Sequence, residues 1–450
     1  MENNTSPRPV VIVGGGISGL AAAYYLAQRG IRPTLIEQAP RLGGMVSTEL
    51  IGGNRVENGP DSFLLNKTAA VELIRAIGLE DQLIPRNEAR HATYIWKQGR
   101  LQPLPDGLSM MIPTRILPIL RSGLLSWRTK LRMGLEWFRG KQGSAEEESV
   151  GELVRRHYGQ EAVDYLAEPL LAGVYGGDCE KMSATEVLGR FVELERRYGS
   201  LTKGVLRERS KGAKAEFRSM KGGMGQITER LAELLRDQCD FITGRVESLQ
   251  HAGDLWRLRV GDEWTEARQV VLACSALGSG RLLGSADLAS IEHTSVATVM
   301  FGFRGADLQH PLNGFGFLVP KRERRLLLAA TWVNTKFDHR AAADTVLIRC
   351  FTGIDGMNLG DGALTAAMLD ELKEKMGLAA KPAFTRINRW PQSMPQYHVG
   401  HRALVKRIEA ALPAGVYLVG NAYSGVGVPD CIRLAKAAAG NVAIALQQKA

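Results

Sequence analysis

A glycine-rich segment near the start of the chain has the spacing of a phosphate-binding turn. Pro9 to Val13 is a short apolar run typical of a buried parallel strand. The residues that follow it directly are Gly14, Gly15, Gly16, Ile17, Ser18 and Gly19. In this G-x-G-x-x-G pattern the first glycine permits a tight turn, the second lets a pyrophosphate approach the backbone, and the third lets helix and strand pack closely. We therefore expect a dinucleotide at the start of the next helix.

An acidic residue indicates which kind of dinucleotide binds. After a helical apolar pattern over residues 17–30, the strand RPTLIEQ brings Glu37 to a position about 20 residues beyond Gly16. A carboxylate there can accept hydrogen bonds from both ribose hydroxyls of an adenosine, and it would repel a 2′-phosphate, which argues against NADP. Gly43 and Gly44 form a second glycine pair that can lie against the same phosphates, and NAD dehydrogenases generally lack it.

The composition limits the class of protein. The chain has 450 residues, 45% hydrophobic and 23% charged, which is enough for two or three globular domains. Its net charge of +10 favours acidic substrates or anionic surfaces. The five cysteines form no C-x-x-C pair, so we expect no metal site and no disulfide framework. The first residues lack a secretory signal pattern and no apolar segment is long enough to span a membrane, so we expect a cytoplasmic protein.

Distant segments are expected to complete the dinucleotide-binding domain. Residues 240–249 and 269–276 are predicted strands that flank a hairpin, and Val246 can offer its backbone to the adenine. Residues 415–421 are a predicted strand, followed by a glycine loop and a helix from about residue 430 to 447. The fold class is therefore α/β, with a Rossmann-like domain assembled from discontinuous segments. Those segments are residues 1–92, 221–289 and 391–450.

Two insertions separate these segments. Residues 93–220 are predicted to be mostly helical, and residues 115–141 contain seven basic residues and one acid interleaved with Trp127, Trp137 and Phe138. That pattern is typical of an interfacial membrane helix, although a helical domain with a solvated basic face has the same composition. Residues 290–390 alternate apolar and polar side chains and are predicted to form an antiparallel sheet that walls a substrate cavity.

Five motifs give the chain a specific resemblance. In chain order they are GPDSF at 59–63, GVYGGD at 173–178, GFGFLVP at 314–320, RWPQSMPQY at 389–397 and GNAYSGVGVPDC at 420–431. Together they resemble the oxygen-dependent protoporphyrinogen oxidase family of the amine oxidase superfamily, which includes the coproporphyrinogen III oxidases of some bacteria. The resemblance covers nearly the whole chain. It implies FAD-dependent removal of six electrons from protoporphyrinogen IX or coproporphyrinogen III in heme biosynthesis, with O2 as acceptor and H2O2 as product.

The resemblance also implies which residues hold the FAD. Besides residues 14–19, those for the phosphates and adenosine are Glu37, Gly43, Gly44, Met45 and Val246. Those around the isoalloxazine are Gly59, Pro60, Asp61, Ser62, Trp390, Asn421, Val426, Gly427 and Val428. Two positions depart from common patterns. Met45 replaces an arginine that many relatives carry, and Asn421 replaces an aspartate that many flavoproteins use to bind the ribityl chain, so the ribityl role of Asn421 is open.

Substrate contacts are implied in the same way. The positions that match the cavity around the macrocycle are Gly173, Phe315, Leu318 and Phe351. An arginine that meets a propionate precedes a tyrosine in the family, and the segment before Tyr94 offers either Arg90 or His91. No protein side chain is assigned a catalytic role, because the flavin would carry out the oxidation.

Several hypotheses about partners and alternatives stay open at this stage. No nucleic acid is expected. The partner hypotheses are peripheral contact with the cytoplasmic face of the membrane, product handover to other heme-biosynthesis enzymes, and a homodimer. A different amine oxidase would need an aromatic cage, and a desaturase would need a longer apolar tunnel. A flavin-containing tetrapyrrole-binding protein without turnover would keep the same binding residues, so only an assay separates it from the oxidase.

Overall fold

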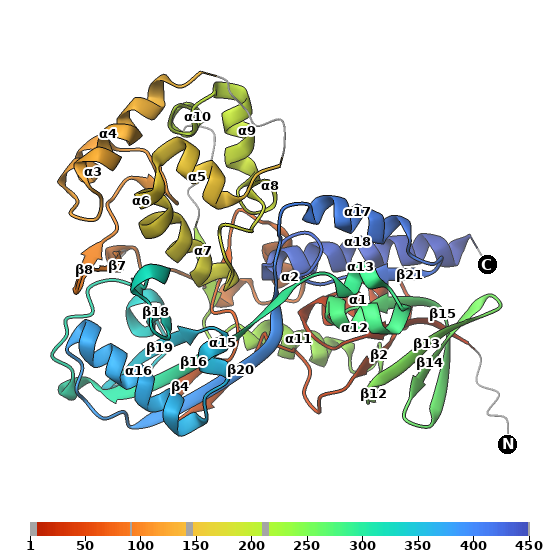
Figure 1. Cartoon of the computed structure of the whole chain (residues 1–450). Coiled ribbons are helices and arrows are strands. Elements are labelled where there is room, and N and C mark those ends of the chain that lie inside the picture. The colour runs from red at the N-terminus through yellow and green to blue at the C-terminus, as the bar shows by residue number, and fades with distance from the viewer. Residues whose placement is uncertain (1–6, 91, 141–146, 209–215, 449–450) are drawn as a thin grey trace.

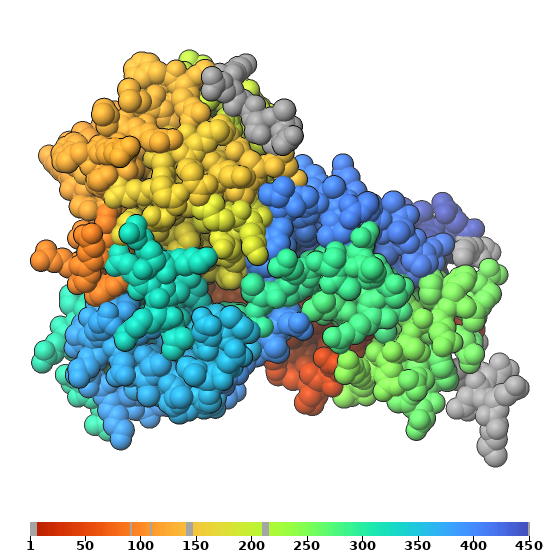
Figure 2. All heavy atoms as spheres, in the orientation of Figure 1, coloured from red at the N-terminus to blue at the C-terminus, as the bar shows by residue number. Residues whose placement is uncertain are grey.

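The computed structural model describes residues 7–90, 92–140, 147–208 and 216–448, which fold into three regions (Figure 1). The first is a parallel sheet with covering helices, made from the two ends and the middle of the chain. The others are an antiparallel sheet and a group of helices. In the space-filling view the helical region, orange to yellow, rests on the antiparallel-sheet region, teal to blue (Figure 2).

Five parallel strands form the centre of the first region. Their order is β12-β2-β1-β15-β21, and a hairpin extends antiparallel from the first half of β15. The bounds are β1 (Arg8–Val13), β2 (Thr34–Glu37), β12 (Asp240–Thr243), β15 (Glu263–Leu272) and β21 (Val416–Leu418), with β13 (Val246–Ala252) and β14 (Leu255–Val260) as the hairpin. Val10 and Ile12 pack on one side of β1 and Val11 and Val13 on the other, so the strand is buried on both faces as its apolar run predicts.

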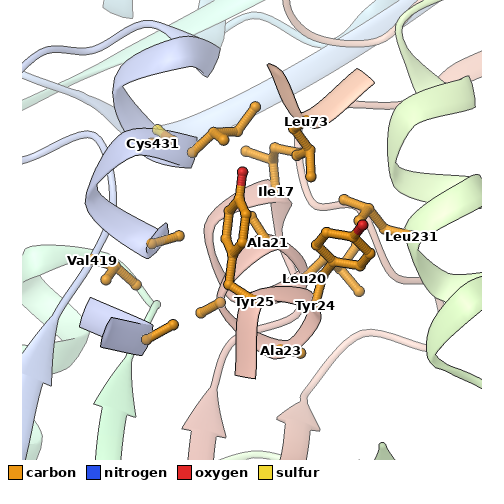
Figure 3. Close-up of a cluster of buried hydrophobic side chains, with 14 of the residues drawn as sticks. Ile17, Leu20, Ala21, Ala23, Tyr24, Tyr25, Leu73, Leu231, Val419 and Cys431 are labelled. Atoms are coloured by element: carbon orange, nitrogen blue, oxygen red, sulfur yellow. The ribbon is translucent and has the colours of Figure 1, made fainter. Parts of the chain in front are cut away.

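Helices α1 (Ile17–Ala27) and α18 (Val428–Gln447) pack together over one face of this sheet (Figure 3). The alanines of α1 allow a close approach, and the rings of Tyr24 and Tyr25 fill the space beside them with centroids 5.5 Å apart. Leu73 of α2 (Ala69–Ala76) and Leu231 of α11 (Gly225–Leu235) close the same core. Segments from both ends of the chain and from its middle therefore share one core.

The antiparallel sheet has the order β20-β16-β19-β18-β17-β7-β8, and only the β17–β7 pair is parallel. Its strands are β7 (Thr93–Lys97), β8 (Arg100–Pro103), β16 (His293–Arg304), β17 (Gly316–Leu318), β18 (Leu327–Trp332), β19 (Thr345–Thr352) and β20 (Phe384–Pro395). One face packs on α16 (Asp361–Met376) through residues such as Phe301, Ile348 and Cys350. We call the opposite face, which carries Met300, Arg349 and Phe351, the inner face.

Two strands of the segment that the sequence assigns to the helical insertion lie in this sheet. Residues 93–103 form β7 and β8, and β7 pairs with β17 through Thr93 and Gly316. The partner strand begins more than 200 residues later in the chain, so no local pattern in residues 93–103 indicates it.

The helical region follows from residue 116. Its helices are α3 (Ile116–Arg121), α4 (Trp127–Leu135), η3 (Glu136–Phe138), α5 (Val150–Tyr158), α6 (Gln160–Ala162), η4 (Val163–Ala167), α7 (Glu168–Tyr175), α8 (Ala184–Val187), α9 (Gly189–Tyr198) and α10 (Leu201–Glu208). Ser149 begins α5 with a capping box, in which its hydroxyl accepts from the Glu152 backbone N–H and the Glu152 carboxylate accepts from the Ser149 N–H. In the described parts of the chain, no helix combines the length and the apolar character needed to cross a membrane.

Shorter elements connect the three regions. The strands are β3 (Thr48–Ile51), β4 (Asn54–Glu57), β5 (Phe63–Leu64), β6 (Leu83–Pro85), β9 (Leu108–Ser109), β10 (Ile112–Pro113) and β11 (Phe217–Met220). The helices are η1 (Glu80–Gln82), η2 (Glu88–Arg90), α12 (Ala276–Leu283), α13 (Ala286–Ala289), η5 (Gly305–Asp307), η6 (Lys321–Glu323), α14 (Val333–Lys336), α15 (Ile354–Met357) and α17 (His401–Ala410).

Candidate active site

The first glycine turn has the geometry of an anion-binding loop. Gly14 has a φ of 110°, and a Cβ there would lie 2.8 Å from the Ala273 carbonyl oxygen, so only glycine fits. A Cβ on Gly19 would lie 1.9 Å from the Gly14 carbonyl oxygen, which is the close packing that the third glycine of the pattern permits. A Cβ on Gly16 would meet no protein atom within 4 Å. The backbone at Gly16 therefore borders open space at the start of α1.

The second glycine pair closes the other side of this space. The Gly43 N–H donates to the Gly15 carbonyl oxygen at 2.8 Å, and a Cβ on Gly44 would lie 3.1 Å from the Gly16 Cα. Two glycine loops thus meet at Gly16, and neither places a side chain in the space between them. That arrangement, at the N-terminus of a helix, fits the pyrophosphate of a dinucleotide.

Glu37 ends β2 beside the first turn. Its carboxylate accepts from the Gly15 N–H at 2.6 Å and from the Ala39 N–H at 2.8 Å. Each carboxylate oxygen keeps a free lone pair for a ribose hydroxyl. The Glu37 carbonyl oxygen accepts from the Gly244 N–H at 2.8 Å, which holds the segment leading to Val246 against the same edge of the sheet. The Val246 side chain is buried in the core, so only its backbone can meet an adenine.

Residues 58–62 run from this glycine cradle toward the inner face of the antiparallel sheet, and we call them the strip. The Asn58 N–H donates to the Ser47 carbonyl oxygen at 3.0 Å, and a Cβ on Gly59 would lie 2.1 Å from the Met45 carbonyl oxygen. Pro60 continues the strip toward Asp61. The Trp390 indole N–H on β20 donates to the Asn58 carbonyl oxygen at 2.8 Å. The strip is therefore fixed between the two sheets.

Asp61 is ionised by its surroundings. Burial alone would raise the pKa of this carboxyl, but the ammonium of Lys336, 2.7 Å from Oδ2, and the Ser62 hydroxyl, 2.6 Å from Oδ1, outweigh that effect. The net result is a pKa well below the ordinary range of an aspartate. Asp61 is thus an anion paired with a lysine from α14, and it is not a candidate general acid at neutral pH.

The C-terminal motif forms a loop that ends at α18. The Tyr397 hydroxyl donates to the Asn421 carbonyl oxygen at 2.5 Å, and the Asn421 amide donates to the Ser393 carbonyl oxygen at 3.2 Å. Val426 and Gly427 are half-buried, and Val428 is the first residue of the helix. The N-terminus of this 20-residue helix carries a partial positive charge. The Asp430 carboxylate in the first turn accepts from the Gly427 N–H at 3.2 Å and pairs with Lys67, so this helix end is already capped by one of its own side chains.

Three of the predicted substrate residues lie on or against the inner face. Leu318 and Phe351 share this face with Ala329 between them in the sheet register. A Cβ on Gly173 of α7 would lie 3.2 Å from Leu318 Cδ2, so the helical region approaches the sheet at this point. Phe315 precedes β17, and its ring centroid lies 4.9 Å from the guanidinium carbon of Arg86.

Of the two candidate propionate anchors, the structure describes only Arg90. Arg90 ends η2 and is exposed, whereas His91 lies outside the described residues. The sequence analysis identified none of three cations near the strip: the half-buried Lys336 and the buried Arg340 and Arg349. Arg349 has a detectable signal, because it stands two residues before Phe351 in an alternating strand and must share its face.

No metal site competes with a dinucleotide in the part of the chain that the structure describes. There, no group of three or more histidine, cysteine, aspartate or glutamate side chains lies close enough together to hold a metal ion. All five cysteines are free, and burial raises the pKa of the Cys431 thiol to about 11, so it is not a reactive thiolate at neutral pH.

A parallel sheet with a glycine cradle, joined to a second, antiparallel sheet, is the architecture typical of nucleotide-dependent oxidoreductases. Residues 17–443 match the model of the flavin-containing amine oxidoreductases, and the chain belongs to that family. Among curated proteins it is 34% identical to the coproporphyrinogen III oxidase of Bacillus subtilis (strain 168) over 95% of this chain and 96% of that protein. It is 26% identical to the mitochondrial protoporphyrinogen oxidase of Nicotiana tabacum over 95% of this chain and 93% of that protein.

Solved structures show the same fold. A crystal structure from Exiguobacterium sp. 255-15, described as a candidate protoporphyrinogen oxidase, is 32% identical, with a TM-score of 0.89 over 98% of this chain and 99% of that one. A cyclohexylamine oxidase from Brevibacterium oxydans has a TM-score of 0.69 at 19% identity, over 97% of this chain and 99% of that one. At that identity the likeness concerns the fold alone.

Proposed function

We propose that this protein is a FAD-dependent porphyrinogen oxidase of heme biosynthesis and that coproporphyrinogen III is its preferred substrate. The observation that carries the proposal is identity of 30–34% over nearly full length to proteins named coproporphyrinogen III oxidase from several bacteria. The glycine cradle, the strip and the apolar residues of the inner face supply a site of the required kind. The glycine cradle and Glu37 fit the pyrophosphate and the adenosine of FAD.

The overall reaction removes six electrons and six protons from the porphyrinogen in three two-electron steps, and each step reduces one O2 to H2O2. Bound FAD would supply the two-electron acceptor chemistry. The chain's own task is to hold the two reactants in contact. Trp390 and Lys336 fix the strip, while Leu318 and Phe351 offer apolar surface to the macrocycle and exclude water.

The central experiment is an oxidation assay with two substrates. We expect purified yellow protein to convert coproporphyrinogen III to its fluorescent porphyrin faster than protoporphyrinogen IX, with H2O2 as coproduct. A rate equal to autoxidation with both substrates would indicate a tetrapyrrole-binding protein without turnover. Activity only on amines or polyenes would indicate another amine oxidase or a desaturase.

Cofactor binding is tested at Gly16. A valine there meets no protein atom near its Cβ, so Gly16→Val should fold normally while its side chain fills the space proposed for the pyrophosphate. We expect a folded, colourless protein. Gly189→Val is the matched control, because a Cβ at Gly189 also meets nothing within 4 Å and that residue begins α9, away from the cradle. Normal yellow colour in Gly16→Val would contradict the placement of FAD.

The propionate anchor is proposed at Arg90 or His91. A charge-assisted pair with a carboxylate contributes roughly 1.5 to 3 kcal/mol, about ten- to a hundredfold in binding. The anchoring residue, when changed to alanine, should raise KM by that factor and leave the FAD spectrum unchanged. If neither variant changes KM by more than about twofold, the anchor lies elsewhere.

We also propose that the helical region binds the cytoplasmic face of an anionic membrane. Nine of the sixteen exposed large hydrophobic side chains in the described ranges come from residues 110–138. Trp127, Leu131 and Leu135 recur at every fourth position of α4 and are 71%, 66% and 59% exposed. Arg128 and Arg132 stand beside this stripe on the same helix. An apolar stripe flanked by arginines is the pattern of an interfacial helix.

A cationic groove adjoins the stripe. It has a volume of about 660 Å³ and is lined by Lys97, Arg128, Arg132, Arg155 and Arg322, with only Glu161 and Asp164 as acids. Anionic lipid headgroups match this excess of positive charge, which contributes about 1 kcal/mol for each basic residue near the surface.

Sedimentation with vesicles tests the membrane proposal. The protein should sediment with anionic vesicles and less so as salt increases. The double variant Trp127→Glu, Leu131→Glu should bind anionic vesicles at least tenfold more weakly, because burial of each apolar side chain contributes about 1.5 to 3 kcal/mol. Leu50→Glu is the control, because Leu50 is 68% exposed but far from these helices in the chain. Equal recovery with neutral and anionic vesicles would favour a solvated basic face. Product handover and a homodimer stay hypotheses.

A further inference from the structure

A cluster of buried and half-buried charged side chains lies at the Asp61 end of the strip and behind it. Glu57 pairs with Arg340 at 3.3 Å, with side chains 3% and 1% exposed, and Asp61 pairs with Lys336 at 2.7 Å. Ser219 joins the two pairs, because its hydroxyl donates to the Asp61 carbonyl oxygen at 2.6 Å and accepts from the Arg340 guanidinium. Each carboxylate of the cluster therefore already has a cation of its own.

Arg349 is the fifth charge of the cluster. Among the described residues it forms no direct ion pair, and Asp61 and Glu57 act on it only as more distant charges. It is 4% exposed, its Nε has no hydrogen-bond partner among the described residues, and its Nη2 donates only to the Asn58 carbonyl oxygen at 3.5 Å. Its guanidinium carbon lies 4.9 Å from the ring centroid of Phe351. A buried guanidinium with unused donors is costly, and further negative charge close to it would lower that cost.

The cluster as a whole holds three cations and two anions. The unpaired cation lies at the point where the strip meets the inner face, and both Arg349 and Trp390 donate to the same carbonyl oxygen of Asn58. Residues of that strip border the isoalloxazine under the proposed function, on which this inference rests. The Asn58 amide oxygen is also without a hydrogen-bond partner among the described residues. Arg340 Nη1 lacks one as well, but it lies 3.3 Å from the Glu57 carboxylate as an ion pair.

We propose that Arg349 is a positioning residue whose charge stabilises the negative charge that two-electron reduction places on the flavin. A cation in a buried site of low dielectric acts over several ångströms, so contact with the flavin is not required. The charge favours the reduced cofactor and raises its reduction potential, which eases removal of electrons from the porphyrinogen. Arg349 would at the same time hold the strip through Asn58.

The test is the reduction potential of the bound flavin, measured by equilibration with a reference dye in holoprotein without substrate. In Arg349→Met the ratio of reduced to oxidised flavin at a fixed potential should fall about tenfold, which corresponds to a potential lower by about 30 mV for two electrons. The reduction potential of the flavin in Arg349→Lys should stay close to the wild-type value. Arg386→Met is the matched control. Arg386 lies opposite Met300 of the inner face, on β20, which β16 separates from β19, but its side chain is exposed and paired with Glu49.

The outcomes separate this inference from the proposed function. A wild-type protein that binds no FAD would refute the flavin site itself. If the ratio of reduced to oxidised flavin in Arg349→Met stays within threefold of the wild-type ratio, only the role of Arg349 is refuted. A raised KM together with that unchanged ratio would make Arg349 a substrate contact instead. Equal losses in the methionine and lysine variants would also overturn the charge argument. If Arg349→Met does not retain FAD, Arg349→Gln is measured in its place under the same criteria.

Discussion

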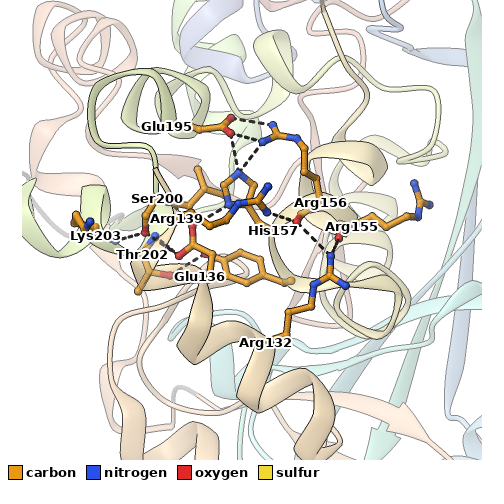
Figure 4. A network of polar contacts seen from close by, with 12 residues as sticks. Arg132, Glu136, Arg139, Arg155, Arg156, His157, Glu195, Ser200, Thr202 and Lys203 are labelled. Carbon is orange, nitrogen blue, oxygen red and sulfur yellow. Dashed lines mark hydrogen bonds and ion pairs between the residues drawn. The ribbon is translucent and has the colours of Figure 1, made fainter. Parts of the chain in front are cut away.

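Two clusters of charged side chains are buried in this protein, one in the helical region and one behind the strip. In the helical region the ring of His157 lies between two carboxylates, with Nδ1 2.8 Å from Glu136 and Nε2 2.9 Å from Glu195 (Figure 4). Arg156 contacts Glu195 and Glu148. Both ring nitrogens of His157 are thus in hydrogen-bonding contact with a carboxylate oxygen.

The helical cluster is complete, whereas the cluster behind the strip is not. Glu136 also accepts from the Ser200 hydroxyl and from two backbone N–H groups, at 2.9, 2.7 and 3.2 Å. Among the described residues, His157, Glu136 and Glu195 leave no buried side-chain nitrogen or oxygen without a partner. In the cluster at the strip, Asn58, Arg340 and Arg349 each leave one buried atom without a hydrogen-bond partner, and that of Arg340 is ion-paired with Glu57.

The difference separates a structural cluster from one that a ligand completes. Both clusters remove charges from water, which is tolerated when every charge is paired and hydrogen-bonded. The helical cluster meets that condition within the protein and joins η3 to α5 and α9. The cluster behind the strip lies beside the proposed cofactor and contains one more cation than anions. Three changes test this comparison.

The largest expected effect is in the helical cluster. His157→Leu leaves Glu136 and Glu195 buried without the imidazole between them, so we expect a loss of about 3 to 5 kcal/mol in the free energy of unfolding. Urea denaturation followed by circular dichroism measures it. The control is Arg197→Gln, which removes an exposed ion pair of α9 and should change stability by less than about 1 kcal/mol. A loss below 1 kcal/mol in His157→Leu would mean that the cluster is not structural.

Acid should weaken the same cluster. Burial alone would raise the pKa of Glu195, but His157 and Arg156 outweigh that effect and lower it to about 2. A lowered carboxyl pKa gives stability that is present above the unfolded value near 4.3 and is lost as the pH falls toward 2, here roughly 3 kcal/mol. Urea midpoints between pH 5 and pH 2.5 should therefore decline, and Glu195→Gln should decline less steeply. Equal slopes in the two proteins would contradict this origin.

The smallest expected effect is on the stability of the strip cluster. Arg349→Met replaces a guanidinium that has unused donors with an apolar side chain of similar length, and Asp61 and Glu57 keep their own cations. We expect the free energy of unfolding of the FAD-free protein to change by no more than about 1 kcal/mol. Denaturation in parallel with His157→Leu makes the comparison direct. Equal losses in both variants would show that Arg349 is as structural as His157.

The parts of the fold that depend on local spacing could be predicted from the sequence. The glycine turn after β1, the helix that follows it and the strand ending at Glu37 were all expected, because a tight turn and an amphipathic period are visible within about 30 residues. The strand before α18 was expected for the same reason. The family relationship was predictable from the five motifs and is confirmed by the comparisons.

Long-range contacts were decided only by the tertiary structure. The sequence by itself determined the glycine turn at the start of α1, because Gly14, Gly16 and Gly19 act within one turn of backbone. It did not show that β7 joins the antiparallel sheet beside β17, because pairing between strands uses backbone groups and depends little on the residue types of either strand. Nor did it show that Glu57, Lys336 and Arg349 share one buried cluster. Charged residues on distant strands acquire their partners, or lack them, only when the two sheets pack against the strip.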